Sequence, residues 1–132
     1  MDTEPPPPPP LATPLVASSS EDNTVAIISY LSPVGFIVAA ILHTKNKTKI
    51  GAFHLRQSLG LIITAVAISI GFALISAILP FLVFLLFPVY SLLWVGVIVL
   101  AIVGLIAAAN RKFTPIPFLG DQYVKYLGTA FD

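Results

Sequence analysis

The chain has 132 residues, of which 57% are hydrophobic and 10% are charged, and seven Lys and Arg nearly balance six Asp and Glu to give a net charge of +1. This composition excludes an ordinary water-soluble domain, in which about 25% of residues are charged. The net charge is too small to suggest nucleic-acid binding, which usually involves a basic stripe on the surface and a high pI. No charged residue lies between Arg56 and Arg111. The sequence therefore predicts an integral membrane protein.

The N-terminal segment, residues 1–23, contains six consecutive prolines at positions 5–10. Proline fixes φ and lacks a backbone N–H, so this run favours polyproline II over a helix. The polar residues that follow show no hydrophobic periodicity. We expect a disordered proline-rich tail over residues 1–23, which is either simply solvated or bound by a partner that recognises polyproline II.

The first predicted transmembrane helix covers residues 24–43, which include no Asp, Glu, Lys or Arg. At about 1.5 Å per residue, such a helix spans the hydrocarbon core of about 30 Å. Pro33 predicts a kink, because it lacks the N–H that would bond to the carbonyl of Ser29. A basic loop follows, with Lys45, Lys47 and Lys49.

Residues 52–79 and 89–109 are the second and third predicted helices. The uncharged stretch that contains them has room for two spans of about 20 residues and a connection, but not for three spans. Pro80 and Pro88 mark the connection, because proline disfavours a helical conformation in the residue before it. We expect the apolar residues 81–87 to form a short interfacial or re-entrant segment.

The fold class predicted is therefore an all-α integral membrane bundle of three transmembrane helices. Every Lys and Arg lies either between the first and second predicted helices, at the entry to the second helix, or after the third. The positive-inside rule then places the first loop and the C-terminus in the cytoplasm and the tail outside. After this transmembrane domain, residues 24–112, the aromatic residues of segment 113–132 predict a C-terminal segment on the bilayer surface.

The polar residues that stand out are His54, Arg56 and Gln57, at the entry to the second predicted helix. No ionisable side chain lies in the interior of a predicted span, which argues against a proton relay or ion-coupled transport. His43 and His54 flank the basic loop and, with Asn46, could approach a metal, but their spacing matches no ligand signature. We expect interfacial hydrogen bonding and no catalytic, cofactor or metal site.

Small residues recur every four positions along the second predicted helix, at Ala65, Ser69, Ala73 and Ala77. This spacing places them on one face and lets helices pack closely in lipid. The stripe predicts packing within the three-helix bundle or, as an alternative, self-association of the chain.

Three runs carry a resemblance to a known family: YLSPVG at 30–35, AFHLRQSLG at 52–60 and PIPFLG at 115–120. Over residues 24–127, the chain resembles a family of small bacterial membrane proteins of unknown function that is similar to the plastid import component of the Tic translocon. The resemblance implies a bacterial cytoplasmic membrane and no catalytic role. It also implies that the polar residues of the second run are the ones that matter.

The function predicted is a non-enzymatic membrane module that packs against other membrane proteins during protein translocation or insertion. The alternative is a homo-oligomeric pore or small-solute permeation unit, which the stripe of small residues favours. A lipid-modifying enzyme is a third hypothesis and would depend on His43 or His54. The expected partners are the lipid bilayer and either other membrane proteins or further copies of the chain. Neither a nucleic acid nor a small-molecule substrate is expected.

Overall fold

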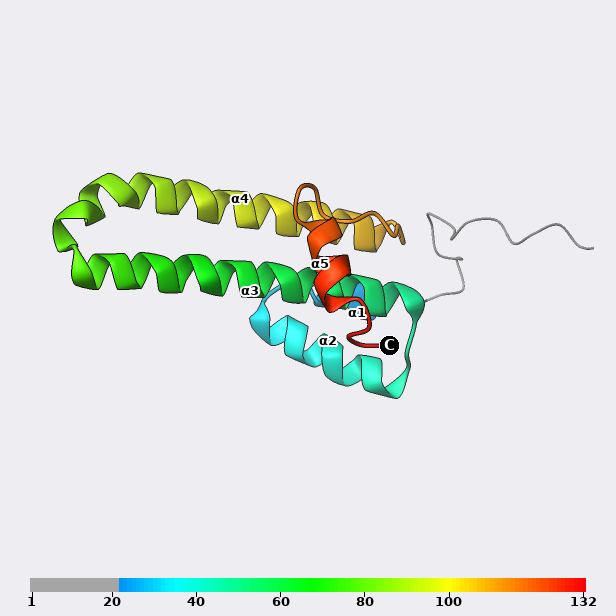
Figure 1. Ribbon diagram of the computed structural model, residues 1–132. Coiled ribbons are helices and arrows are strands. Elements are labelled where there is room, and N and C mark those ends of the chain that lie inside the picture. The colour runs from blue at the N-terminus through cyan, green and yellow to red at the C-terminus, as the bar shows by residue number, and fades with distance from the viewer. Residues whose placement is uncertain (1–21) are drawn as a thin grey trace, which may run out of the picture.

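The computed structural model describes residues 22–132, so the predicted tail lies outside the described residues except for Asp22 and Asn23. This part of the chain is helical, without a strand. Its elements are α1 (Thr24–Ile28), α2 (Pro33–Lys45), α3 (Lys49–Ile78), the 3-10 turn η1 (Pro80–Leu82), α4 (Val83–Ala109) and α5 (Gly120–Leu127). Helices α3 and α4 form a long antiparallel hairpin, closed at one end by η1 and open at the other (Figure 1).

Two helical stretches of the described chain, Lys49–Ile78 and Pro80–Ala109, are long and apolar enough to cross a membrane. Each has 30 residues and measures about 45 Å, which exceeds the hydrocarbon thickness of about 30 Å. Only 6% and 11% of their most apolar windows are buried within the chain. Core helices of a soluble protein would be mostly buried, so these exposed apolar surfaces favour contact with lipid.

The predicted single helix over residues 24–43 is broken in two in the structure, because α1 ends at Ile28 and α2 begins at Pro33. Pro33 cannot supply the N–H that would continue the helix. Ser32 adopts an extended backbone, and its side chain caps α2 by accepting a 2.9 Å hydrogen bond from the Gly35 N–H. The expected kink is therefore a complete break, and the 13 residues of α2 are too few to span the bilayer.

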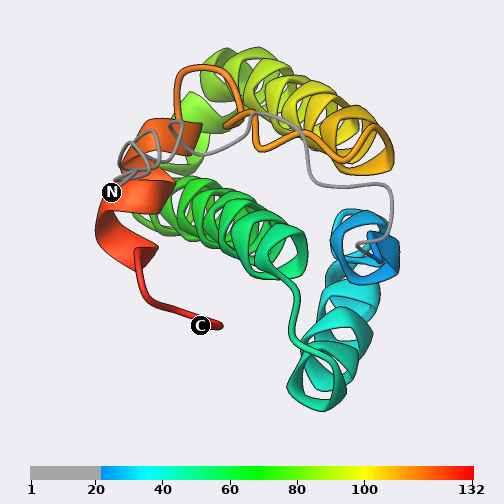
Figure 2. The same ribbon diagram turned by 90° about the vertical axis from the view of Figure 1, so that its right-hand side faces the viewer.

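Helices α1 and α2 form a V that starts and finishes at the open end of the hairpin. Asn23, just before α1, donates hydrogen bonds to the carbonyls of Ala108 and Ala109, at 3.0 and 3.2 Å, where α4 ends. After the break, α2 runs back until His43 lies beside Gly51, near the start of α3. Figure 2 shows both arms of the V on one side of the hairpin.

The connection between the two long helices also differs from the expectation. Most of residues 81–87 belongs to α4, which begins at Val83, so there is no separate interfacial or re-entrant segment. Pro88 lies inside α4, where its missing N–H removes only the bond to the Phe84 carbonyl. Phe81 and Phe84 are 73% and 94% exposed, so the closed end presents an apolar surface.

The open end is where the described chain is packed. Its buried apolar side chains form three small clusters: Ala26, Ile50 and Ala108; Val25, Ala39 and Leu55; and Leu61, Ile116 and Tyr123. We call this packed part the head (residues 22–61 and 104–132) and the remaining hairpin the stem (residues 62–103). All seven Lys and Arg residues belong to the head.

The end of α4 is shaped by a Schellman motif. Arg111 takes a left-handed conformation with φ of 56°, and its N–H bonds to the Ala108 carbonyl at 3.1 Å. The N–H of Lys112 reaches back to the Ala107 carbonyl at 2.9 Å. These bonds satisfy carbonyls that the helix end would leave open, and they turn the chain back over α3.

Candidate functional site

The candidate site lies where the C-terminal segment packs on the first turns of α3, and His54 is its first anchor. The His54 ring is fully buried. Its Nε2 lies 2.8 Å from the Lys112 carbonyl oxygen, and its Nδ1 lies 2.8 Å from the Tyr30 hydroxyl. Because a carbonyl can only accept, Nε2 carries the hydrogen, and Nδ1 of the neutral ring accepts a hydrogen bond from the Tyr30 hydroxyl. Both ring nitrogens thus join the turn after α1 to the chain after α4.

Gln57, one turn further along α3, holds the loop before α5. Its amide nitrogen donates to the Gly120 carbonyl at 3.1 Å, and its amide oxygen accepts from the Ile116 N–H at 3.1 Å. The side chain is fully buried. Gly120 allows this close approach, since a Cβ there would lie 2.8 Å from the Gln57 oxygen and 2.6 Å from Pro115 Cβ. One amide group therefore satisfies the Ile116 N–H, which would otherwise be buried without a partner, and gives the Gly120 carbonyl at the start of α5 a second hydrogen bond.

Arg56 holds the last residues of the described chain. Its Nε donates to the Ala130 carbonyl at 2.8 Å, and its guanidinium pairs with the carboxylate of Asp132. Lys47 donates to the Asp132 carbonyl at 3.0 Å. The Asp132 side chain of this pair is 59% exposed, so the pair adds little to stability on its own. Its contribution is to hold residues 130–132 against α3.

Tyr123 of α5 packs directly on α3 at Gly60. A Cβ at Gly60 would lie only 2.3 to 2.5 Å from atoms of the Tyr123 ring, so only glycine admits the ring. The Thr64 hydroxyl donates to the Gly60 carbonyl at 2.9 Å and accepts from the Tyr123 hydroxyl at 2.6 Å. Burial raises the pKa of Tyr123 above its ordinary value, although the bond to Thr64 acts in the opposite direction. The phenol is therefore a protonated donor at neutral pH.

These contacts form one unit, which we call the C-terminal clasp: Tyr30, His54, Arg56, Gln57, Gly60, Thr64 and Tyr123. The structure brings all three predicted polar residues into it. No sequence pattern indicates Tyr30 or Tyr123, which lie 24 and 59 residues from their α3 partners. The Tyr123 ring packs against Gly60, although the sequence predicts that the aromatic residues of its segment lie on the bilayer surface.

The two histidines are not brought to a shared ligand set. His43 is also buried, but its Nε2 donates to the Phe131 carbonyl at 2.6 Å, far along the chain from the partners of His54. The Phe131 ring packs edge-on against Phe36 and His43. Within residues 22–132, no three His, Asp or Glu residues are grouped as a metal site would require. The arrangement supports structural clasping by these side chains.

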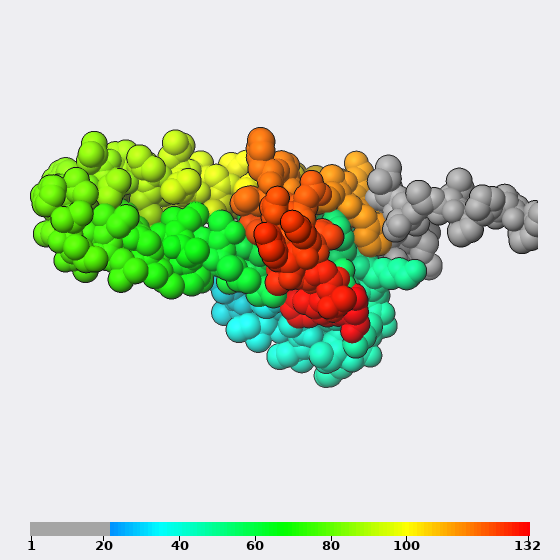
Figure 3. Space-filling model, in the orientation of Figure 1, coloured from blue at the N-terminus to red at the C-terminus, as the bar shows by residue number. Residues whose placement is uncertain are grey.

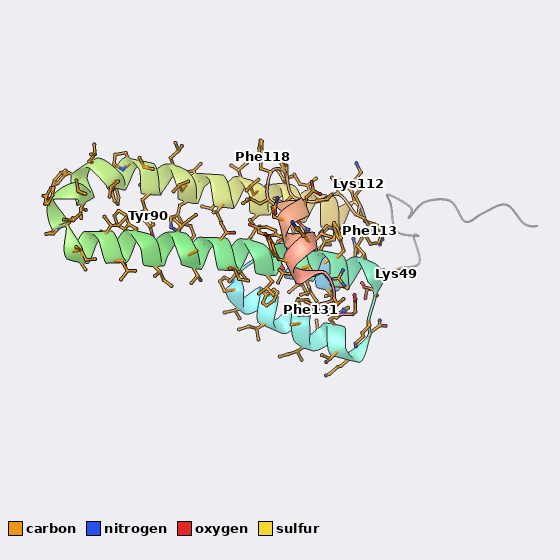
Figure 4. The ribbon with its side chains drawn as sticks, viewed as in Figure 1. Lys49, Tyr90, Lys112, Phe113, Phe118 and Phe131 are labelled. Carbon is orange, nitrogen blue, oxygen red and sulfur yellow. The ribbon has the colours of Figure 1, made fainter. Side chains whose placement is uncertain are left out.

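The C-terminal segment was expected to lie on the bilayer surface as a whole, and its side chains divide instead. Tyr123 is buried and Phe131 is half-buried against α2. Phe118 and Tyr126 are exposed, and Figure 4 shows Phe118 pointing away from the hairpin. One face of the segment therefore packs on the protein, and the other is free to meet the surroundings.

The fold and the clasp define a small all-helical membrane protein with a long apolar hairpin and a packed basic head. Residues 21–121, more than half of the chain, match the magnetosome magnetite crystal formation protein family, MamF/MmsF, and the chain belongs to that family. No curated protein matches the chain. No solved structure matches it either.

The family match corrects the resemblance drawn from the three sequence runs. The chain is a member of a magnetosome family, and nothing relates it to the plastid import component. All three runs lie inside the residues that match the magnetosome family. In the structure they form the break between α1 and α2, the first turns of α3 and the loop before α5.

Proposed function

We propose that this chain is a non-enzymatic membrane protein that takes part in the formation of magnetite crystals. The observation that carries the proposal is the family match over residues 21–121. The geometry supports a non-catalytic role, because the His43 and His54 rings are both buried and both nitrogens of His54 are occupied by structural hydrogen bonds. A catalytic acid or base needs a free group that can reach a substrate. The hairpin supplies the membrane anchor and the clasp supplies a rigid head.

The proposal is tested in cells that form magnetite. Deleting the gene for this chain should change the size or the number of crystals seen by electron microscopy. Restoring a Gly71→Ala variant should return the normal crystals, because nothing lies within 4 Å of a Cβ at Gly71. Restoring Gly60→Ala should not, because that methyl group collides with Tyr123. Crystals that stay normal after deletion would contradict the proposed function.

The proposed topology has two spans, α3 and the stretch from η1 to the end of α4. The V of α1 and α2 enters and leaves at the head, so Asp22, Lys45 and Asp132 are all on one side of the membrane. All Lys and Arg lie in the head, and the positive-inside rule orients it toward the cytoplasm. This replaces the three-span arrangement, in which residue 23 and Lys45 lie on opposite sides.

A labelling experiment separates the two topologies, because the chain has no cysteine and one can be introduced at a time. We expect Asp22→Cys and Lys45→Cys to react with a membrane-impermeant maleimide from the same side. Phe81→Cys, at the closed end, should not react from that side. Both head positions are exposed, so access does not limit the reaction. Labelling of Asp22→Cys and Lys45→Cys from opposite sides would overturn the two-span topology.

A further inference from the structure

The width of the chain differs greatly between its two ends. In the head, the hairpin is flanked by α1 and α2 on one side and by α5 on the other (Figure 2). Toward the closed end of the stem only α3, η1 and α4 remain, and the two long helices are held together there by contacts such as the stacked rings of Phe72 and Tyr90, whose centroids are 4.2 Å apart. Figure 3 shows this contrast between a broad head and a narrow stem.

The helices that broaden the head do not simply form a soluble domain outside the membrane, because α2 exposes a row of large apolar side chains. Val34 and Ile37 are 69% and 59% exposed. Their exposed neighbours on the same arm of the V are Leu31, Val38, Ile41 and Leu42. Leaving this surface in water would cost about 25 cal/mol for each Å². Acyl chains of the bilayer are the surroundings that such a helix face fits.

The position of α2 along the hairpin limits it to one leaflet. Its first residues lie near the middle of α3, since Leu31, Ser32 and Pro33 line one cavity of about 520 Å³ with Val66 and Ser69. Its last residues reach the start of α3, where His43 lies beside Gly51.

The basic residues around the end of α2 place it at the membrane surface. Lys45 ends α2, and Lys47 and Lys49 follow within four residues, so that their ammonium groups suit lipid phosphates at the headgroup level. The apolar arm of the V therefore occupies the leaflet on the head side, and the opposite leaflet holds only the stem.

We propose that this chain is a membrane wedge that prefers strongly curved bilayers, with its head in the convex leaflet. In a small vesicle the outer leaflet is stretched at the headgroup level and the inner leaflet is compressed. A protein that is broad in one leaflet and narrow in the other relieves both strains when its broad end faces outward. The inference rests on the two-span topology proposed above, and its ligand is the lipid surface.

The test uses the Lys45→Cys chain carrying a fluorescent dye, reconstituted into phosphatidylcholine–phosphatidylglycerol vesicles that are then sorted by diameter. A membrane-impermeant quencher reports the fraction of heads that face outward. We expect this fraction to rise steadily as the diameter falls and to approach an even split in the largest vesicles. An outward fraction that does not change with diameter overturns the wedge.

A double variant, Val34→Asn with Ile37→Asn, tests whether α2 supplies the wedge. Both side chains point away from the protein, so the head should stay folded, which circular dichroism checks. We expect a weaker dependence of the outward fraction on diameter. The matched control, Gln122→Asn on the exposed face of α5, should keep the full dependence. A double variant that behaves like this control contradicts the proposal.

Two further measurements distinguish a failure of the two-span topology from a failure of the wedge. If Asp22→Cys and Lys45→Cys report opposite sides, the two-span topology fails and the wedge fails with it. If they report the same side but diameter has no effect, only the wedge fails. The measurement is repeated at several protein-to-lipid ratios. A dependence that vanishes at low protein density would mean that a second copy covers α2, which also overturns the proposal.

Discussion

Replacing Gly60 by alanine should release the C-terminal segment from α3. The new Cβ would lie 2.3 Å from Tyr123 Cγ and 2.5 Å from both Cδ atoms. A rigid ring cannot yield at these distances, so α5 must move, and the bond from Tyr123 to Thr64 is lost with it. Overpacking of this kind typically costs about 1–3 kcal/mol. We expect a lower unfolding midpoint and faster protease cleavage within residues 113–132.

The same helix provides the control. A Cβ at Gly71 meets nothing within 4 Å, so Gly71→Ala should leave the clasp intact and stabilise α3 by up to about 1 kcal/mol through helix propensity. Helix α4 repeats the comparison, since a Cβ at Gly104 would lie 2.5 Å from the Tyr30 ring while Gly96 is open. Equal stability of Gly60→Ala and Gly71→Ala would show that Tyr123 does not dock in this notch.

Replacing Gln57 by leucine should destabilise the head by about 1–3 kcal/mol. The side chain keeps its approximate volume, but the buried Ile116 N–H loses its partner, and the Gly120 carbonyl loses the hydrogen bond that it accepts in addition to its helical one. A buried backbone N–H that is left unpaired accounts for this cost. Chemical unfolding in detergent micelles measures the loss, and protease cleavage before α5 locates it.

Two other variants sharpen that result. Gln122→Leu, at an exposed position of α5, should change stability by less than about 0.5 kcal/mol. Gln57→Glu keeps an acceptor for Ile116 but removes the donor to Gly120 and introduces a charge, which burial opposes. It should therefore be no more stable than Gln57→Leu. A Gln57→Leu chain as stable as Gln122→Leu would refute the role of Gln57 in holding the loop.

The clasp was partly predictable, and the reason is physical. His54, Arg56 and Gln57 stand at the border of a long uncharged stretch, where polar side chains must find partners. Their partners could not be predicted, because four of them are backbone groups of residues 112, 116, 120 and 130. Nearly every residue carries a backbone N–H and a carbonyl, so the residue types at these positions do not indicate which of them pair with His54, Arg56 and Gln57.

The number of transmembrane spans could likewise be predicted only in part from the sequence. Apolar length alone makes residues 24–43 equivalent to a transmembrane helix, and the same criterion correctly finds the two long helices. The break at Ser32 and Pro33 turns the first stretch into a V, whose direction is fixed by contacts between Asn23 and the end of α4. Local residues can interrupt a helix, but only tertiary packing determines the direction of the chain after the break.

The sequence by itself determined the class of this protein: a small, helical, membrane-embedded chain whose cations gather outside a long apolar stretch. That follows from hydrophobic burial and charge solvation, which depend on composition and order alone. Only the tertiary structure decided that the cations lie together in one head, that the C-terminal segment is held on this head, and that the head is broader than the stem. These properties depend on contacts between residues distant in the chain, such as Tyr123 in the notch at Gly60, which geometry alone makes possible.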